Sequence, residues 1–375
     1  MAEIDPTTIL DEFKAVPDPR IISRTRHKLI DIITITICAT ICGADDWIEI
    51  VDYGLSKYEW LTSFLDLPNG IPSHDTFSRV FSILSPEAFN RCFSNWINTV
   101  FGQPESDVLP IDGKTLRRSH DRSSGKSAIH IVSAWSTKLG ISIGQVKTDA
   151  KSNEIKAIPE LLDILEPKGC IVTIDAMGCQ TKIAKQIIDK GGDYLLALKG
   201  NQGTLHDDVE LFFSDAERTS FKDIPFCYHE TTDGDHGRIE VRKYTTVSDI
   251  DWLNGKDKWA SLKTIGMVES ERHIGDKITA EKRYYISSID NDAQMFAKAV
   301  RSHWGIENSL HWVLDVTFRE DESRIRKGNS AENMAVIRHM ALNLLKQEKT
   351  AKASMKVKRK RCGWDNDYLL KILRT

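Results

Sequence analysis

The order of apolar segments between residues 107 and 198 constrains the fold of this chain more than any other feature. Three strand-like segments come first, at 107–112, 128–135 and 141–147. Helical and strand-like patterns then alternate, with helices at about 158–165 and 181–190 and strands at 170–175 and 194–198. Three consecutive strands followed by an alternating section predict an α/β domain built on one mixed sheet.

This order, βββαβαβ, is that of the ribonuclease-H-like fold. In that fold the first and fourth strands are adjacent, so Asp112 and Asp175, which end two of the predicted strands, would project together. Glu307 lies in a predicted helix over Ala293–Asp315. Three such carboxylates can hold two divalent cations about 4 Å apart, which clamp the attacking and leaving oxygens of a phosphodiester. The alternative is that each strand-ending Asp only forms a turn.

Changes of pattern divide the chain into regions. Residues 1–103 show helical spacing and predict a helical N-terminal domain. Residues 104–347 would form the α/β catalytic domain, interrupted at about 201–292 by a β-rich insertion, since roughly ninety residues exceed a simple connection. Residues 348–375 would be a basic C-terminal tail.

One helix of the N-terminal region is a candidate for nucleic-acid recognition. Ser73 is a plausible N-cap for a helix over 74–84 whose apolar face holds Phe77, Val80, Phe81 and Leu84. A short helix with polar residues at its start suits the recognition helix of a helix-turn-helix. A plain bundle helix fits the same pattern equally well.

Local basic clusters matter more for binding than the formal net charge of −3. Three clusters stand out: Arg20, Arg24, Arg26 and Lys28; Lys114, Arg117 and Arg118; and a C-terminal run that ends in Lys358, Arg359, Lys360 and Arg361. Such patches can bind phosphates because distant acids are screened within about 8 Å at physiological salt. A solvated surface is the alternative for any single patch.

Several other classes of protein are disfavoured. The seven scattered cysteines suit a reducing cytoplasm better than a disulfide framework. The most apolar segment, Ile32–Ala44, is too short to span a bilayer, so we expect no membrane association. His130 alternates with apolar residues and is expected in the core, whereas His311, one turn after Glu307, could support the site. Without a His-x-x-x-His or paired Cys motif, a zinc hydrolase is unexpected.

Several motifs, in order along the chain, resemble one known family. They begin at Ile111-Asp-Gly-Lys-Thr-Leu-Arg-Arg118, Lys151-Ser-Asn-Glu-Ile155 and Val172-Thr-Ile-Asp-Ala-Met-Gly-Cys-Gln180. They continue at Gly192–Gln202, His236-Gly-Arg-Ile-Glu240 and His303-Trp-Gly-Ile-Glu-Asn308. The chain resembles the DDE transposases of bacterial insertion sequences, most closely the group associated with H-repeat and Rhs elements.

The resemblance implies that Asp112, Asp175 and Glu307 form a catalytic triad that binds two Mg²⁺ or Mn²⁺ ions. The substrate would be double-stranded DNA: the terminal inverted repeats of the element, and then target DNA. Water attack would free a 3′-hydroxyl at the element end, which would attack the target. Two ends need two active sites, so we expect a homodimer on DNA, in the bacterial cytoplasm with the nucleoid.

The basic residues around the triad depart from the pattern of related enzymes. Those enzymes often carry Arg four residues before the Glu and Lys seven after it, whereas this chain has His303 and Leu314. Candidates for DNA contacts near the site are therefore Lys114, Arg117, Arg118, His236, Arg238, Arg301, His303 and Lys327. Trp252, Trp259 or Trp304 could stack on a base, although core packing is the better expectation for each.

Two other functions remain compatible with the sequence. The chain could be a catalytically inactive descendant that only binds DNA. It could also be a ribonuclease-H-like nuclease that cuts DNA without strand transfer.

Overall fold

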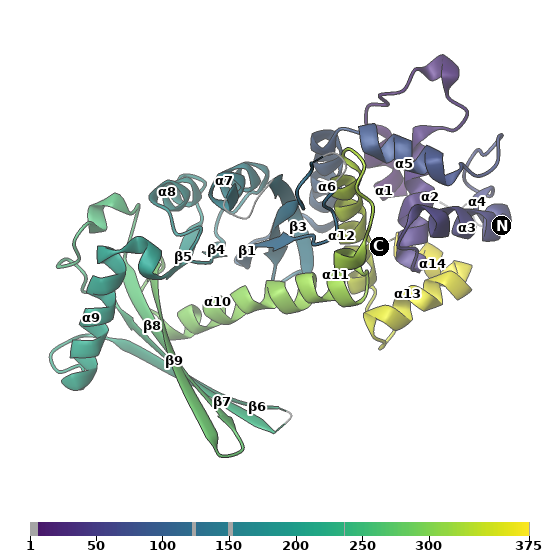
Figure 1. The fold of residues 1–375 in the computed structure, drawn as a ribbon. Coiled ribbons are helices and arrows are strands. Elements are labelled where there is room, and N and C mark those ends of the chain that lie inside the picture. Colours follow the sequence, from purple (N-terminus) through teal and green to yellow (C-terminus); the bar gives the residue numbers. More distant parts are fainter. Residues whose placement is uncertain (1–6, 122–124, 149–152, 236, 375) are drawn as a thin grey trace.

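A computed structural model describes residues 7–121, 125–148, 153–235 and 237–374, and its centre is a nine-stranded mixed sheet (Figure 1). The strand order is β3-β2-β1-β4-β5-β9-β8-β7-β6. The first five strands in the chain are β1 (Val108–Thr115), β2 (His130–Ser136), β3 (Ile141–Thr148), β4 (Ile171–Ile174) and β5 (Asp193–Leu198). All five lie within or close to the predicted segments.

The pairing of β1 with β4 places the two predicted aspartates side by side. These strands run parallel, and their last paired residues are Ile111 and Ile174. Asp112 and Asp175 are the next residues of the two strands. Asp112 lies inside β1, where it pairs with Ser133 of β2, and Asp175 directly follows β4, so the two aspartates stand at adjacent positions. The predicted adjacency of the first and fourth strands is confirmed. β2 pairs antiparallel with both β1 and β3, which makes this half of the sheet mixed.

The insertion extends the same sheet instead of forming a separate unit. Its strands are β6 (Cys227–Asp235), β7 (Arg238–Val247), β8 (Thr264–Ile274) and β9 (Lys277–Ser287). β9 pairs antiparallel with β5, and β8, β7 and β6 follow outward as long hairpins. The strand patterns predicted at 239–247 and 283–287 fall within β7 and β9. Helix α9 (Thr204–Arg218), which precedes β6, was not predicted from the sequence.

Helices cover both faces of the sheet (Figure 1). α7 (Glu154–Ile164) and α8 (Thr181–Asp189) lie on one face, and each buries one apolar side. α10 (Ala293–Ile306) runs along the other face and contacts β1, β4 and β5 as well as β6 and β7. It continues as a π-helical turn, Glu307–His311, and then as α11 (Trp312–Val316). The predicted helix over Ala293–Asp315 is thus present, with one irregular turn.

The N-terminal region is helical, as predicted. Its helices are α1 (Thr7–Lys14), α2 (Leu29–Cys42), α3 (Trp47–Ser56), α4 (Tyr58–Leu61), α5 (His74–Ile83) and α6 (Pro86–Phe101). α2 is apolar on every side and almost wholly buried, which explains its membrane-like composition. Ser73 caps α5 by accepting a hydrogen bond from Thr76 N at 3.4 Å, and Phe77, Val80 and Phe81 form its buried face.

α12 (Ser330–Gln347) joins the helical region to the sheet. Nearly all its residues are buried, because it packs against α2, α5 and α6 on one side and β3 on the other (Figure 1). One continuous hydrophobic cluster therefore includes Phe13 of α1, Trp96 of α6, Leu109 of β1 and Ile337 of α12. The change of pattern near residue 103 marks a change of secondary structure within a shared core.

The predicted C-terminal tail is folded. Residues 355–373 form α13 (Met355–Trp364) and α14 (Asn366–Leu373), which pack against α2 and α12. Cys362, Leu369 and Ile372 are fully buried there. Among the described residues no helix combines the length and apolar character that crossing a bilayer would require.

Candidate active site

The three predicted carboxylates line one cavity, which we call the carboxylate cleft. Asp112 of β1, Asp175 after β4 and Glu307 of the π-helical turn border a space of about 430 Å³. His303, Trp304 and Lys199 are among the other lining residues. The structure therefore gathers the triad where β4 ends beside β1.

Backbone amides and two side chains hold the loop that carries Asp175. Asp175 Oδ1 accepts hydrogen bonds from Met177 N at 3.0 Å and Gly178 N at 3.3 Å. From the turn after β5, Asn201 Nδ2 donates to the carbonyl of Ala176 at 2.7 Å, and Gln202 Nε2 donates to that of Cys179 at 2.5 Å. Asn201 and Gln202, at the end of the Gly192–Gln202 motif, thus hold the Asp175 loop in place, a positioning role that the sequence reasoning missed.

Gly113, next to Asp112, makes room for a buried polar pair. His130 Nε2 and Glu154 Oε1 are 2.6 Å apart, and both side chains are almost inaccessible to solvent. A Cβ atom on Gly113 would lie 2.3 Å from His130 Nε2 and 2.5 Å from Glu154 Oε1. His130 Nδ1 is also 2.8 Å from Thr115 Oγ1. The expectation that His130 is a satisfied core residue is confirmed, and its unforeseen partner, Glu154, belongs to the Lys151–Ile155 motif.

The π-helical turn brings His311 to Asp112. A π-turn inserts one residue into a helix, and such turns often occur at functional sites. Here it carries Glu307 at its start and His311 at its end. His311 Nδ1 lies 3.4 Å from Asp112 Oδ2. Burial and the nearby Lys114 lower the pKa of His311 to about 3, so the ring is neutral at physiological pH. The suggestion that His311 supports the site is consistent with this contact.

Electrostatics single out Asp112 among the three carboxylates. Burial raises its pKa to about 7, the hydrogen bond with the Gly113 backbone opposes that rise, and repulsion from Asp175 and Glu307 adds to it. Mutual repulsion of this kind is relieved by a divalent cation, and carboxylate oxygens are ligands that Mg²⁺ and Mn²⁺ accept.

The three carboxylates are therefore chemically suitable ligands for a divalent cation, although they do not form a closed metal site in this structure. Within the described ranges, no three His, Cys, Asp or Glu side chains converge closely enough to hold a metal ion. Binding would thus require the three carboxylates to approach one another or to share ligands with water or substrate.

His303 faces the cleft but is held by the sheet. Its Nδ1 lies 3.0 Å from Thr173 Oγ1 of β4. Burial lowers the pKa of the ring, while Asp175 opposes that shift, so the imidazole is neutral. A neutral His303 does not supply the positive charge of the missing Arg, and contact between His303 and DNA stays a prediction.

Lys114 is paired with acidic side chains inside the fold. Its ammonium group pairs with Asp315, with Glu320 at 3.1 Å and with Asp321 at 3.7 Å, and its side chain is only 11% exposed. These acids raise the pKa of Lys114 against the opposing effect of burial, which is the largest single influence. Acidic partners therefore surround the charge of Lys114 inside the fold, and contact between Lys114 and DNA stays a prediction.

Other predicted basic residues remain exposed. Arg117 pairs with Asp321 at 3.2 Å but keeps most of its side chain in solvent, and Arg118 and Lys327 are exposed. Arg238 and Arg301 lie on opposite walls of a neighbouring cavity, taken up below. His236 lies outside the described residues. DNA contact by these residues stays a prediction.

The three tryptophans differ in exposure. Trp259 is buried, as core packing predicts, and Trp252 stacks on Phe212 with ring centroids 4.7 Å apart. Trp304 is 40% exposed and lines the carboxylate cleft. Core packing was expected for it. Instead its indole faces the guanidinium of Arg283, another residue of the cleft, whose central carbon lies 4.9 Å from the ring centroid.

Two of the four C-terminal basic residues are structural. Lys358 Nζ donates to the carbonyls of Leu345, at 3.1 Å, and Glu348. Arg359 donates to the carbonyls of Thr40, at 2.9 Å, and Thr317. Both side chains are buried and engaged by backbone oxygens, which is a structural role that the sequence did not indicate, and DNA contact by Lys358 and Arg359 stays a prediction. Lys360 and Arg361 are exposed, and DNA binding by them stays a prediction.

This difference predicts unequal effects on stability. Arg359→Ala should lower the free energy of unfolding by about 2–4 kcal/mol, because it leaves buried carbonyls and Asp45 without their cationic partner. Lys360→Ala, one residue on, should change it by less than about 0.5 kcal/mol. Urea unfolding of both variants measures the difference. Equal stability of the two variants would contradict the structural role of Arg359.

Comparison with known proteins identifies the class. Residues 103–344 match the family model "Transposase DDE domain", and residues 10–97 match the model "DDE_Tnp_1-associated". The chain belongs to this family of DDE transposases.

Relatives match over nearly their whole length. The chain is 43% identical to the "H repeat-associated putative transposase YhhI" of Escherichia coli K12, over 97% of each chain. It is 46% identical to the "Putative transposase YncI" of Escherichia coli O157:H7, covering 98% of this chain and 94% of the relative. A shorter relative, the "Inactive transposase YbfQ" of Escherichia coli K12, matches 20% of this chain at 42% identity.

One solved structure resembles the whole chain distantly. It is a piggyBac transposase synaptic complex with hairpin DNA, with a TM-score of 0.40 and 14% sequence identity, covering 100% of this chain and 79% of the other. The family membership confirms the resemblance inferred from the sequence.

Proposed function

We propose that this chain is a DNA transposase that cleaves DNA at the ends of an insertion element and joins the freed ends to target DNA. The observation that carries the proposal is the meeting of Asp112, Asp175 and Glu307 in one cleft of a chain that belongs to the DDE transposase family. The strand order β3-β2-β1-β4-β5 supports a ribonuclease-H-like core beneath that cleft.

We infer that the three carboxylates hold two Mg²⁺ or Mn²⁺ ions when DNA is bound. Such ions lower the pKa of an attacking water and neutralise the leaving oxygen of a phosphodiester. The protein's own part is to keep the carboxylates together despite their repulsion, through the β1–β4 pairing, the fastened Asp175 loop and the π-helical turn.

DNA binding at the N-terminal helices is part of the proposal. Arg20, Arg24, Arg26 and Arg79 surround a surface hollow beside the start of α5, where positive charge could contact a phosphate backbone. The helix itself keeps the polar His74 exposed, next to its N-cap. We also propose a homodimer on DNA, because two element ends need two active sites.

A plasmid assay tests the proposed function. A donor plasmid carrying the inverted repeats that bound the coding sequence is incubated with the protein, Mg²⁺ and a target plasmid, and joined products are sequenced. The transposase predicts insertion that is lost in Asp175→Ala. Cleavage without joined product would instead indicate a nuclease, and DNA binding without cleavage would indicate an inactive descendant.

A further inference from the structure

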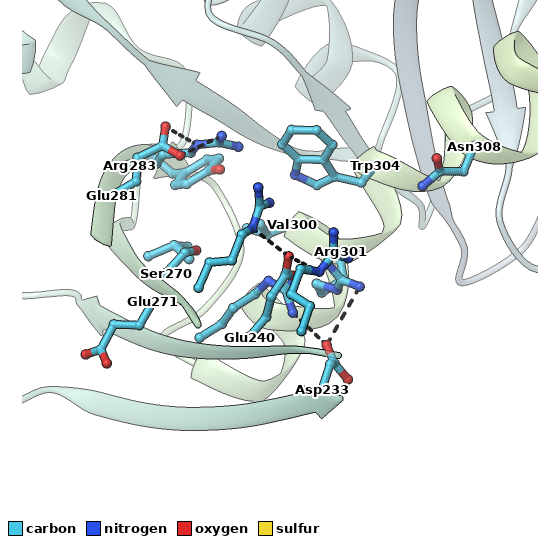
Figure 2. A pocket seen from close by; sticks show the side chains of 15 residues that line it. Asp233, Glu240, Ser270, Glu271, Glu281, Arg283, Val300, Arg301, Trp304 and Asn308 are labelled. Atoms are coloured by element: carbon cyan, nitrogen blue, oxygen red, sulfur yellow. Dashed lines mark hydrogen bonds and ion pairs between the residues drawn. The ribbon is translucent and has the colours of Figure 1, made fainter. Parts of the chain in front are cut away.

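A second cavity, rich in arginine, lies between the insertion and α10 (Figure 2). It measures about 450 Å³, and we call it the arginine pocket after five of its lining residues: Arg238, Arg242, Arg272, Arg283 and Arg301. β7 alternates Arg238, Glu240 and Arg242 along one face, as the two-residue period of a strand requires. Arg272 of β8 is the cross-strand partner of Glu240.

Glu240 organises the base of the arginine pocket. Its side chain is 9% exposed, and it contacts Arg238 at 3.1 Å, Arg272 at 3.0 Å and Arg242 at shorter range. One buried carboxylate therefore holds three guanidinium groups together. Figure 2 shows Arg301 reaching toward the same group from the opposite wall, where it lies 3.9 Å from Asp233.

The arginine pocket carries more positive than negative charge. The lining residues include five guanidinium groups and four carboxylates, those of Asp233, Glu240, Glu271 and Glu281, which leaves an excess of one positive charge. Glu271 points away from the group in Figure 2 and pairs with Lys243 at 2.9 Å. Burial and, after it, repulsion from Arg301 lower the pKa of Arg242, while Asp233 opposes that shift. Such a site favours an anion with several acceptor oxygens.

The arginine pocket adjoins the carboxylate cleft. Arg283, Tyr285, Val300 and Trp304 line both cavities. On the helix wall, Arg301 precedes Glu307 by six residues, about 9 Å at 1.5 Å per residue. One DNA strand advances about 3.4 Å per nucleotide. A strand that enters the cleft would therefore bring a phosphate two or three nucleotides away to the arginine pocket.

We propose that the arginine pocket binds a backbone phosphate of the cleaved DNA strand, two or three nucleotides from the bond that is cut. This inference rests on the proposed function and deepens it. It also accounts for the two positions near Glu307 where related enzymes carry Arg and Lys but this chain has His303 and Leu314. The insertion strands β7, β8 and β9 supply cationic groups from the facing wall instead. The specific ligand is a phosphodiester, which two guanidinium groups can bind in bidentate fashion.

Phosphate-ethylation interference tests the proposal. The probe is an end-labelled duplex carrying the boundary of the element that encodes this chain, whose cleavage by the wild-type protein marks the scissile phosphate. Ethylation two or three nucleotides away should weaken wild-type binding several-fold. It should have little further effect on Arg301→Gln or Arg272→Gln, and each of these variants should lower the salt dependence of affinity by about one unit of slope.

Lys243→Gln is the matched control. Lys243 lies on β7 next to Arg242, but its side chain is on the other face, paired with Glu269 and Glu271. It should keep the wild-type interference pattern and salt slope. Arg301→Gln removes only a 3.9 Å pairing with Asp233, so the fold does not depend on it.

The possible outcomes distinguish a failure of the arginine-pocket inference from a failure of the proposed function. If both arginine variants keep the wild-type interference pattern while the wild-type protein binds and cuts, the arginine pocket does not bind phosphate and the transposase proposal stands. A uniform loss of binding with a lowered melting temperature would show a purely structural ion-pair network and likewise overturn the inference. Absence of cleavage and binding by the wild-type protein would overturn the proposed function itself.

Discussion

Replacing Asp112 by Asn is expected to reduce DNA cleavage by about 10³-fold or more while DNA affinity stays within about twofold. Burial and, after it, repulsion from Asp175 and Glu307 raise the pKa of Asp112, so its carboxylate lies close enough to both to share a cation with them. Asn keeps the size of the side chain but cannot supply an anionic ligand. Cleavage of an end-labelled element boundary in Mg²⁺, with binding measured on the same DNA, gives both quantities.

The negative charge of Asp112 also predicts an effect on the melting temperature, which can be measured independently of DNA cleavage. Mg²⁺ should raise the melting temperature of the wild-type protein, because an ion that binds only the folded state stabilises it, and Asp112→Asn should lose most of that increase. Asp189→Asn, on the surface of α8 and paired with Lys185, is the charge-matched control and should behave as wild type. Full cleavage by Asp112→Asn, or an equal loss in the control, would remove Asp112 from the triad.

The sequence predicted the sheet around the triad because short-range patterns determine it. Each of the five core strands is a compact apolar run, and their order alone places β1 beside β4. The insertion strands were also visible as strand patterns. The sequence did not reveal that β9 pairs with β5 and so makes one nine-stranded sheet. Such pairing depends on contacts between residues about ninety apart in the sequence, such as Leu196 and Ile286.

The surroundings of the triad were harder to predict because they depend on charge partners distant in the sequence. Lys114 looked like a DNA contact beside Asp112, yet its partners Asp315 and Glu320 come about 200 residues later. The C-terminal helices were misread for a different reason. The charged run of α13 suggested a solvated tail, although α14 after it has the helical spacing of Tyr368, Leu369 and Ile372, which are buried. Arg359 is buried because Thr40 and Thr317 receive its hydrogen bonds.

Gly113 shows how a motif residue can be required by packing instead of chemistry. The residue has no special backbone conformation, and its constraint is space. The buried His130–Glu154 hydrogen bond of 2.6 Å passes where a Cβ atom would stand. An added methyl group must separate that pair or push β1 away from it, and Asp112 is the adjacent residue of the strand.

Gly113→Ala should therefore lower the free energy of unfolding by about 3 kcal/mol, as expected for overpacking combined with a broken buried polar pair. Urea unfolding measures this, and DNA cleavage should fall with it because Asp112 moves. Gly234→Ala on β6 is the matched control: its Cβ meets nothing within 4 Å, so stability should change by no more than about 1 kcal/mol.

A double-mutant cycle identifies the cause of the Gly113→Ala effect. His130→Ala removes the ring that the new methyl group would strike, so Gly113→Ala should cost markedly less in that background than in the wild-type protein. A coupling of at least about 1 kcal/mol is expected from groups in direct contact. Additive effects of the two substitutions, or a Gly113→Ala protein as stable as wild type, would mean that β1 can shift at little cost. The glycine of the Ile111–Arg118 motif would then need an explanation at the DNA itself.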